Sequence, residues 1–416
     1  MIRYTKFIFL VVLGGLLATK PGRCQSWEQT GAPSNSWQAV ACSADGSELV
    51  AAAATLDGSK INGNVPGPIY ISTNSGATWT QTGATNEMWN SVASSADGTK
   101  LAAVAGFDGI YMSTNSGDTW FLTALPAHFS FWSSVALSAD GTRVVAAASS
   151  AIDGPEIYTS TNSGLDWTPT GAPSSLSNYW NSLTSSADGR KLAVVGSVED
   201  ISTENFTRSI YISTNSGITW VQVNTPNEPW SSVIISVDGS KLIAEAERSK
   251  LIFTSTNSGA DWTQNNFVGL VGLVSSVDET KLVGITPGAK FLGTTNQVFR
   301  STDSGLTWNP IAVPPGTNGF GIASSSADGN KLFAIANGYI YVWEAAPQPQ
   351  LNLTAANANL TLSWIIPSTN FVLQQSSDLS IWADLTNVPI LNFSNLLNQI
   401  TLPQSAENGF YRLKTE

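Results

Sequence analysis

Short apolar runs, separated by Gly, Asp, Asn and Ser, recur along almost the whole chain. In one typical stretch the runs are Trp89–Ser95, Lys100–Ala105, Gly109–Ser113 and Thr119–Thr123. Runs of five to seven residues that are bounded by turn-forming residues indicate antiparallel strands. No segment beyond the first residues repeats its apolar positions at helical spacing, so we expect almost no helix.

Two turn motifs alternate between these runs and divide the chain into repeats. The first, Ser-x-Asp-Gly, occurs seven times at a mean spacing of about 47 residues, beginning at Ser43, Ser95, Ser138, Ser186, Ser236, the degenerate Ser276 and Ser326. The second, Ser-Thr-Asn/Asp-Ser-Gly-x-Thr/Asp-Trp, occurs six times and ends at Trp79, Trp120, Trp167, Trp220, Trp262 and Trp308. Four strands in a repeat of this length predict the blades of a β-propeller.

The last repeat lacks the second motif and a fourth strand. After the seventh turn, Lys331–Ala336 and Tyr339–Trp343 supply only a second and a third strand. At the other end of the chain, Trp27–Gly31 resembles the fourth strand at Trp79–Gly83 but has no blade before it. We therefore expect an all-β fold, a seven-bladed propeller over residues 25–345 that the N-terminal strand closes.

A different segment follows the propeller. Residues 346–350 contain two prolines and are predicted to be a linker. Residues 351–416 keep the alternating apolar pattern but contain neither motif. We expect this tail to form a small, independent β-sandwich.

The second motif resembles the Asp-box (BNR) repeat of sialidase-like, sortilin-like and photosystem-assembly-factor-like propellers. The Asp of that repeat is kept only at Asp303, and Asn replaces it at positions 74, 115, 162, 215 and 257. The resemblance covers about 320 residues and implies the propeller fold, but propellers of this kind host unrelated activities. The tail, in Phe371–Trp382 and Phe410–Leu413, is similar to a small C-terminal β domain common on secreted bacterial proteins.

Both motifs are interpreted as turns rather than as ligand sites. The Gly of the Asp-box allows a positive φ in a tight hairpin, while its Ser and Asn side chains bind backbone N–H groups. The closing Trp is expected to bury its ring against the neighbouring blade. The Asp of Ser-x-Asp-Gly has a similar structural role at a hairpin tip.

Residues 1–24 have the pattern of a signal peptide. Arg3 and Lys6 precede the apolar run Phe7–Ala18, which is too short to span a bilayer. We expect cleavage after Cys24 and export, with the protein secreted, periplasmic or at the cell surface; a lipid anchor on Cys24 is the alternative. No later apolar run is long enough for a membrane-spanning helix.

Composition excludes several classes of protein. Charged residues make up 12% of the chain and the formal net charge is −11, with no basic run, which argues against nucleic acid and anionic membranes as partners. The single histidine, His128, excludes a multi-histidine metal site. The two cysteines, Cys24 and Cys42, exclude a disulfide scaffold and a Cys-rich zinc site. We therefore expect no metal and no cofactor.

Loop length indicates where a partner binds. Both motifs lie on one face of a propeller with this topology, whereas the connections on the other face vary from residues 55–68 to the short 107–109. Variable loops often carry function, so this loop face is the predicted binding surface. An aromatic residue opens the innermost strand at that face in six repeats: Trp37, Trp89, Trp132, Trp180, Trp230 and Phe320. These are the candidate ligand-binding residues, as a platform for sugar rings or an anchor for a peptide; the alternative is that they pack the blades.

Enzymatic activity is the competing hypothesis. The resemblance to sialidases implies several arginines that converge on a substrate carboxylate, yet only Arg208 and Arg248 are expected on the loop face. A glycoside hydrolase with two carboxylates stays open because acidic residues lie in or beside the variable loops: Asp57, Asp108, Asp153, Glu156, Glu199, Asp200, Glu204 and Glu247. No Ser-His-Asp set or phosphate loop is visible, so no catalytic residue is assigned.

These observations favour a monomeric, exported, non-catalytic propeller that binds or scaffolds a partner. The expected ligand is a polysaccharide or an envelope or extracellular protein. One alternative is a carbohydrate-active hydrolase, and another is a protein-interaction propeller that resembles the photosystem assembly factors.

Overall fold

The protein is represented by a computed structural model that describes most of the chain. The described residues are 26–54, 66–106, 108–124, 131–149, 156–173, 179–200, 205–226, 228–286, 296–314, 321–345, 351–356, 359–365, 371–377, 381–393, 396–403 and 410–415. Every regular element in these ranges is a β-strand, in agreement with the sequence pattern. The predicted signal peptide and linker lie outside the described residues.

Four-stranded antiparallel sheets make up the larger part of the fold, and between residues 26 and 345 each of them pairs its strands in chain order except the one in which β1 lies beside β28. The first strands are β2 (Ser36–Cys42), β6 (Trp89–Ser94), β10 (Phe131–Leu137), β14 (Tyr179–Ser185), β18 (Trp230–Ile235), β22 (Val271–Ser275) and β26 (Gly321–Ser325). The second strands are β3 (Leu49–Ala54), β7 (Leu101–Ala105), β11 (Val144–Ser149), β15 (Leu192–Asp200), β19 (Leu242–Ala246), β23 (Leu282–Thr286) and β27 (Lys331–Ala336).

The outer half of each sheet follows the same order. The third strands are β4 (Ile69–Ser72), β8 (Gly109–Ser113), β12 (Glu156–Ser160), β16 (Asn205–Ser213), β20 (Leu251–Ser255), β24 (Gln297–Ser301) and β28 (Tyr339–Glu344). The fourth strands are β5 (Thr80–Gln81), β9 (Phe121–Leu122), β13 (Thr168–Pro169), β17 (Val221–Gln222), β21 (Thr263–Val268) and β25 (Asn309–Ile311), with β1 (Glu28–Gln29) beside β28. The four strands predicted between residues 89 and 123 are therefore confirmed as β6, β7, β8 and β9.

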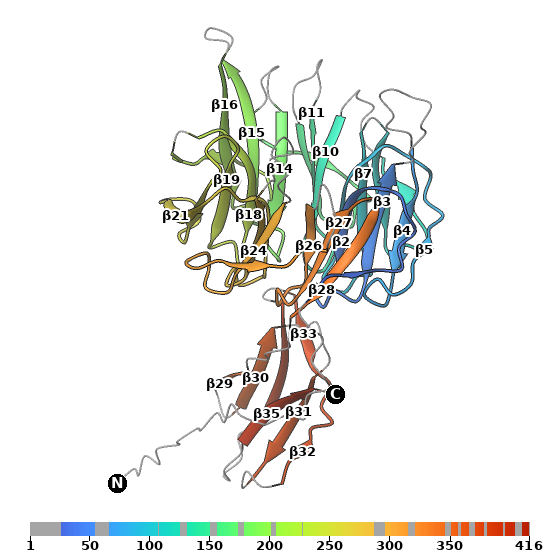
Figure 1. The fold of residues 1–416 in the computed structure, drawn as a ribbon, viewed down its shortest axis with the longest axis vertical. Helices are drawn as coiled ribbons and strands as arrows, with labels where there is room; N and C mark the ends of the chain where they lie inside the picture. Colours follow the sequence, from blue (N-terminus) through green and yellow to red (C-terminus); the bar gives the residue numbers. More distant parts are fainter. Residues whose placement is uncertain are drawn as a thin grey trace.

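These sheets are arranged as a β-propeller, with successive sheets side by side around a common axis (Figure 1). The first strands contact one another in chain order, and β26 also contacts β2. The apolar clusters lie between neighbouring sheets: one of them joins Val50 and Ile69 of one sheet to Trp89 and Tyr111 of the next. The second strands consist largely of Ala and Val that are fully buried, and these small residues let neighbouring sheets approach closely.

The N-terminal strand pairs with a strand from the far end of the propeller. Glu28 lies opposite Val342 and Gln29 opposite Tyr341, so β1 takes the fourth position in the sheet of β26, β27 and β28. The equivalent pairing in the sheet of β2 to β5 joins Thr80 to Ile71 and Gln81 to Tyr70. The two ends of this part of the chain therefore share one sheet.

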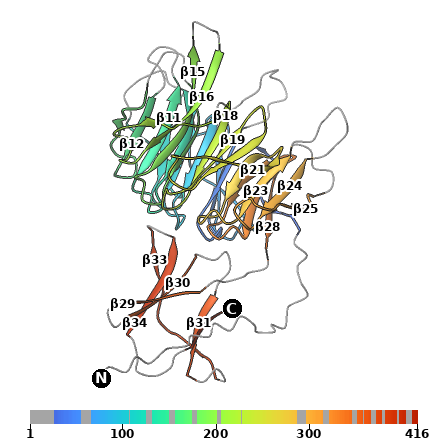
Figure 2. The same cartoon turned by 90° about the vertical axis from the view of Figure 1, so that its left-hand side faces the viewer.

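The C-terminal residues form two further sheets below the propeller (Figures 1 and 2). One contains β29 (Asn352–Ala356), β30 (Asn359–Ile365), β34 (Leu397–Pro403) and β33 (Ile390–Asn392), and the other contains β32 (Ala383–Asp384), β31 (Phe371–Ser376) and β35 (Phe410–Thr415). A single apolar cluster includes Leu362 and Trp364 of the first sheet and Leu373 of the second. The two sheets thus share a core, but this unit also contacts the propeller, which the sequence did not predict.

Candidate binding face

The Ser-x-Asp-Gly turns use their polar side chains within the turn. In the second turn the hydroxyl of Ser95 donates to Asp97 Oδ1 at 2.6 Å, and the same oxygen accepts the backbone N–H of Thr99 at 3.0 Å. Burial opposes ionisation of Asp97, but the hydrogen bonds from Ser95 and Thr99 outweigh it and lower the pKa of this carboxyl. The turn interpretation of these aspartates agrees with these bonds.

The Asp-box turns are also closed on themselves. Asn74 Oδ1 accepts the N–H of Thr78 at 2.8 Å, and Ser72 Oγ accepts the N–H of Gly76 at 2.9 Å. Ser75 and Gly76 both have positive φ, 56° and 86°, so the tight turn needs two left-handed residues rather than one. The indole of Trp79 donates to the carbonyl of Gly76 at 3.1 Å.

The two kinds of turn lie together on one face. The N–H of Ser75 in the Asp-box donates to the carbonyl of Ser47, which follows the Ser-x-Asp-Gly turn of the same sheet, at 2.8 Å. Ser116 and Thr99 make the same contact in the next sheet. This turn face is therefore occupied by structural hydrogen bonds, and the connections on the opposite side form the loop face.

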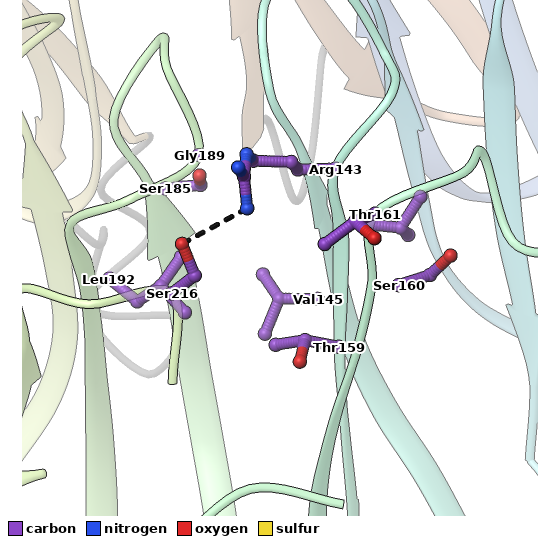
Figure 3. Close-up of a pocket in the computed structure, with 10 residues that line it drawn as sticks. Arg143, Val145, Thr159, Ser160, Thr161, Ser185, Gly189, Leu192 and Ser216 are labelled. Carbon is purple, nitrogen blue, oxygen red and sulfur yellow. Dashed lines mark hydrogen bonds between the residues drawn. The ribbon is translucent and has the colours of Figure 1, made fainter. Parts of the chain in front are cut away.

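A small cavity lies on the turn face (Figure 3). It lies between the sheets of β10–β13 and β14–β17, with Val145, Thr159 and Leu192 in its wall, and Arg143 NH1 donates to Ser216 Oγ at 3.1 Å beside it. Its volume is about 10 Å³, enough for a single water molecule. Arg143 therefore links the two neighbouring sheets.

The candidate tryptophans are buried in the interfaces between sheets. Trp37, Trp89, Trp132, Trp180 and Trp230 expose between 0% and 6% of their surfaces. Each stands against an aromatic ring of the third strand in its sheet, for example Trp180 against Tyr211 at 5.8 Å and 88°. A ring that is buried in this way offers almost no face to a sugar, so the placement favours the packing interpretation. Phe320 lies outside the described residues.

The residue that follows each of these tryptophans is displaced by a β-bulge. In the sheet of β6 and β7, Trp89 pairs with Ala105 and Ser91 pairs with Val104, which leaves Asn90 as the extra residue. The same register shift occurs in the other tryptophan-bearing sheets, so the extra residues are Gln38, Asn90, Ser133, Asn181 and Ser231. A bulge changes the direction in which a side chain points, and here the bulges place polar side chains at the inner edge of the sheets.

Two of these bulge residues connect neighbouring first strands. Asn90 Nδ2 donates to the carbonyl of Trp132 at 2.7 Å, and Ser133 Oγ donates to the carbonyl of Trp180 at 2.8 Å. Gln38 and Asn181 are exposed. Sequence analysis missed this set, although the recurrence of Gln, Asn or Ser after Trp was a visible signal.

Acidic side chains gather on the loop face in pairs with hydroxyl or guanidinium groups. Tyr111 donates to Glu87 at 2.9 Å, and Asp108 also lies within reach of this carboxyl. Burial raises the pKa of Glu87, the hydrogen bond from Tyr111 opposes this, and the charge of Asp108 adds to the rise. Tyr158 donates to Glu156 at 2.8 Å in another sheet.

One basic group of this face, Arg208, has an acidic partner. Arg208 forms an ion pair with Glu247, and its NH1 group also donates to the carbonyl of Trp230 at 3.5 Å. Arg143 and Arg300 lie toward the turn face, where Arg300 donates to the carbonyl of Gly329 at 3.2 Å. The described arginines therefore do not converge as a sialidase site requires.

The predicted carboxylates that the structure describes are spread over several sheets. Asp108, Glu156 and Glu247 belong to three different sheets and have the partners given above. Glu199 and Asp200 lie in β15, while Asp57, Asp153 and Glu204 are outside the described residues.

Two other kinds of site are absent from the described residues. They contain no group of three His, Cys, Asp or Glu side chains arranged to hold a metal ion. Nor does any helix there have the length and apolar character to cross a bilayer.

Comparison with known proteins identifies the fold. No protein family and no curated protein sequence matches the chain. Among solved structures it is similar to YCF48 bound to D1 peptide, with a TM-score of 0.56 and 16% identity over 78% of this chain and 98% of that one.

Two further structures are similar to a comparable degree. YCF48 from Cyanidioschyzon merolae has a TM-score of 0.54 and 13% identity, and covers 77% of this chain and 98% of its own. The Cps50 (Swd1) β-propeller domain of Myceliophteria thermophila has a TM-score of 0.54 and 11% identity over 77% of this chain and 99% of its own. At these identities the likeness establishes a β-propeller and nothing finer.

Proposed function

We propose that the protein is an exported, non-catalytic propeller whose loop face binds a basic segment of another envelope or extracellular protein. The observation that carries the proposal is the acidic character of this face. The acidic residues described there are Glu87, Asp108, Glu156, Glu228 and Glu247, against Arg208, Arg248 and Lys250. The acidic residues outnumber the basic ones, and Arg208 is paired with Glu247, so acidic side chains remain for a basic partner.

A protein partner suits this surface better than a polysaccharide does. The tryptophans that favoured sugar stacking have almost no exposed ring, whereas Gln38 and Asn181 present amide groups that pair readily with a peptide backbone. The structural likeness to a YCF48 that is bound to a peptide supports the same choice. The secreted location and the monomeric state are part of the proposal.

We also propose that the propeller has seven blades and that β1 closes the ring. The pairing of β1 with β28 supports closure, as does a chain of backbone hydrogen bonds from sheet to sheet. These bonds run from Ala44 through the equivalent turns to Ala327, whose N–H donates to the carbonyl of Ala44 at 2.6 Å.

The binding proposal is tested with random peptides displayed on phage and selected on the immobilised protein. We expect selected peptides to be rich in Lys and Arg and to bind more weakly as salt is raised. Asp108→Lys should weaken binding about tenfold or more, because it reverses charge on the loop face. Asp118→Lys is the matched control, since Asp118 is an exposed aspartate of the same sheet on the turn face.

Two results of these experiments would contradict the proposal, each in a different part. Selection of neutral or acidic peptides would overturn the proposed chemistry of the partner. Equal loss of binding in Asp108→Lys and Asp118→Lys would overturn the loop face as its location.

A further inference from the structure

The second residues of the Ser-x-Asp-Gly turns form a ring of small apolar side chains, which we call the turn ring. Its members are Ala44, Ala96, Ala139, Ala187, Val237, Val277 and Ala327. The N–H of each donates to the carbonyl of the next at 2.6–3.3 Å, and the last bond returns to Ala44. Each residue comes two positions after a first strand, so the turn ring lies at the axis of the propeller on the turn face.

A hairpin of the C-terminal sandwich lies on this ring. Leu391, Phe393 and Leu396, at the tip between β33 and β34, belong to one apolar cluster with the whole turn ring, and Ile365 of β30 joins them. Figures 1 and 2 show β33 pointing from the sandwich toward the underside of the propeller. The N–H of Leu396 donates to the carbonyl of Asn392 at 2.8 Å, which holds the tip in shape.

The burial on both sides shows that the contact covers the middle of the ring. Leu396 exposes 9% of its surface, and Ala44, Ala139, Ala187 and Ala327 expose 5–8%. These ring residues form two neighbouring pairs, Ala327 with Ala44 and Ala139 with Ala187, and other ring residues separate the pairs on both sides of the cycle of hydrogen bonds. Leu396 shares one apolar cluster with both pairs, which favours a position of the tip over the centre of the ring.

Other apolar residues of the sandwich are not used in this way. Ile381, Val388 and Ile390 expose 75–84% of their surfaces. Among the described residues, the apolar side chains that the sandwich places against the turn ring are therefore those of the hairpin tip and Ile365.

We propose that this hairpin is a cap in cis: it closes the central channel at the turn face and leaves the loop face as the entrance. An uncapped turn ring would expose a set of apolar side chains at the end of the channel, which favours a permanently docked cap. The sandwich then covers the turn face of the propeller, and the loop face points away from the sandwich. This inference does not depend on the identity of the partner in the proposed function.

The cap is tested by cysteine labelling of the full chain. Ala187→Cys places a thiol in the apolar cluster that contains Leu396, and a polyethylene-glycol maleimide is too bulky to reach it through the channel. We expect Cys at position 187 to react at least about tenfold more slowly than Cys in Thr114→Cys, an exposed position on the same face. Labelling of the unsubstituted chain supplies the background.

The second part of the labelling experiment removes the cap. In the Ala187→Cys chain, Leu396→Asp should accelerate labelling about tenfold or more, because a buried carboxylate would lift the tip from the ring. Val388→Asp is the matched control, since it adds the same charge to the sandwich at a residue that is 84% exposed. Cys42 reports on the propeller, because its thiol contacts Ser324 and stays unlabelled while the sheets remain folded.

Either of two results would overturn the cap. One is a Cys at position 187 that reacts as fast as the Thr114→Cys thiol in the otherwise unchanged chain. The other is slow labelling that Leu396→Asp does not alter. If Leu396→Asp exposes Cys42, the milder Phe393→Ser variant replaces it and is judged by the same two results.

Discussion

The indole of Trp89 stands edge-on against the phenol ring of Tyr111, with ring centroids 5.2 Å apart and planes at 77°. Its Nε1 donates to the carbonyl of Gly67 in the preceding sheet at 2.7 Å. The tryptophan therefore satisfies its polar atom and buries its ring at once, as a structural residue between sheets does.

Replacement of this ring tests its packing role. Trp89→Ala should lower the free energy of unfolding by about 3–5 kcal/mol, because it leaves a cavity between two sheets. Chemical denaturation measures the change. Leu122→Ala is the control, since Leu122 is 55% exposed on the same sheet and should change stability by less than about 0.5 kcal/mol. A Trp89→Ala protein as stable as the parent would contradict the packing role.

Glu279 occupies a position where the other Ser-x-Asp-Gly turns have glycine. It has a φ of 54° and exposes only 2% of its surface, and neither carboxylate oxygen has a hydrogen-bond partner within the described residues. Burial raises its pKa to about 8, against the favourable charge of Lys241. The folded protein thus prefers the protonated carboxyl.

This preference predicts a pH dependence of stability. Because the pKa is about 8 in the folded state, against an ordinary value of 4.5, the free energy of unfolding should fall as pH rises between these values, by a few kcal/mol. Glu279→Gln should remove this fall, and Glu279→Gly should also relieve the left-handed strain. Denaturation at about pH 5, near the lower end of this range, and at about pH 9, above its upper end, measures both effects. Equal pH dependence in the parent and in Glu279→Gln would show that Glu279 is not the cause.

The aspartate of an ordinary turn should behave in the opposite way. Asp97→Ala removes the acceptor of the Ser95 hydroxyl and of the Thr99 N–H, which should cost about 1–3 kcal/mol near neutral pH. The pKa of Asp97 is lowered, so its contribution is present above 3.8 and is lost as pH falls through the folded-state pKa. Denaturation curves at neutral and at acidic pH measure this, and Asp118→Ala, at an exposed Asp-box position, is the control. A loss of stability that persists unchanged in acid would rule out the carboxylate as its source.

The thiol of Cys42 should be unreactive in the folded protein. Its Sγ lies 3.1 Å from Ser324 Oγ, at the contact of β2 with β26, and burial raises its pKa to about 12. Since the thiolate is the reactive form, labelling by a disulfide reagent at about pH 8 should follow global unfolding. The labelling rate in increasing denaturant checks this. Rapid reaction under native conditions would mean that the first and last sheets separate locally.

The repeat and its strands were readable from the sequence because their determinants are local. A Ser-x-Asp-Gly turn is held by bonds such as Ser95 to Asp97, and an Asp-box by bonds such as Thr78 to Asn74. Residues two to four positions apart form these bonds in every copy. Strand identity, turn chemistry and the fourth-strand character of Glu28–Gln29 therefore show in the residue pattern itself.

The role of the tryptophans depended on their surroundings. The same Trp at the start of an innermost strand would be a binding platform if exposed and a packing residue if covered. What covers Trp89 includes Val50 and Ile69 of another sheet, and no local pattern reports such neighbours.

By itself, then, the amino-acid sequence determined the all-β repeat, the two turns that separate its strands, and the hydrogen bonding of the polar residues within these turns. Only the tertiary structure decided that five tryptophans are buried, that bulges displace the polar residue after each of them, and that Leu396 shares an apolar cluster with Ala187 and its equivalents. The physical reason is that turns are stabilised by hydrogen bonds between near neighbours, whereas burial is a property of surfaces brought together from distant parts of the chain.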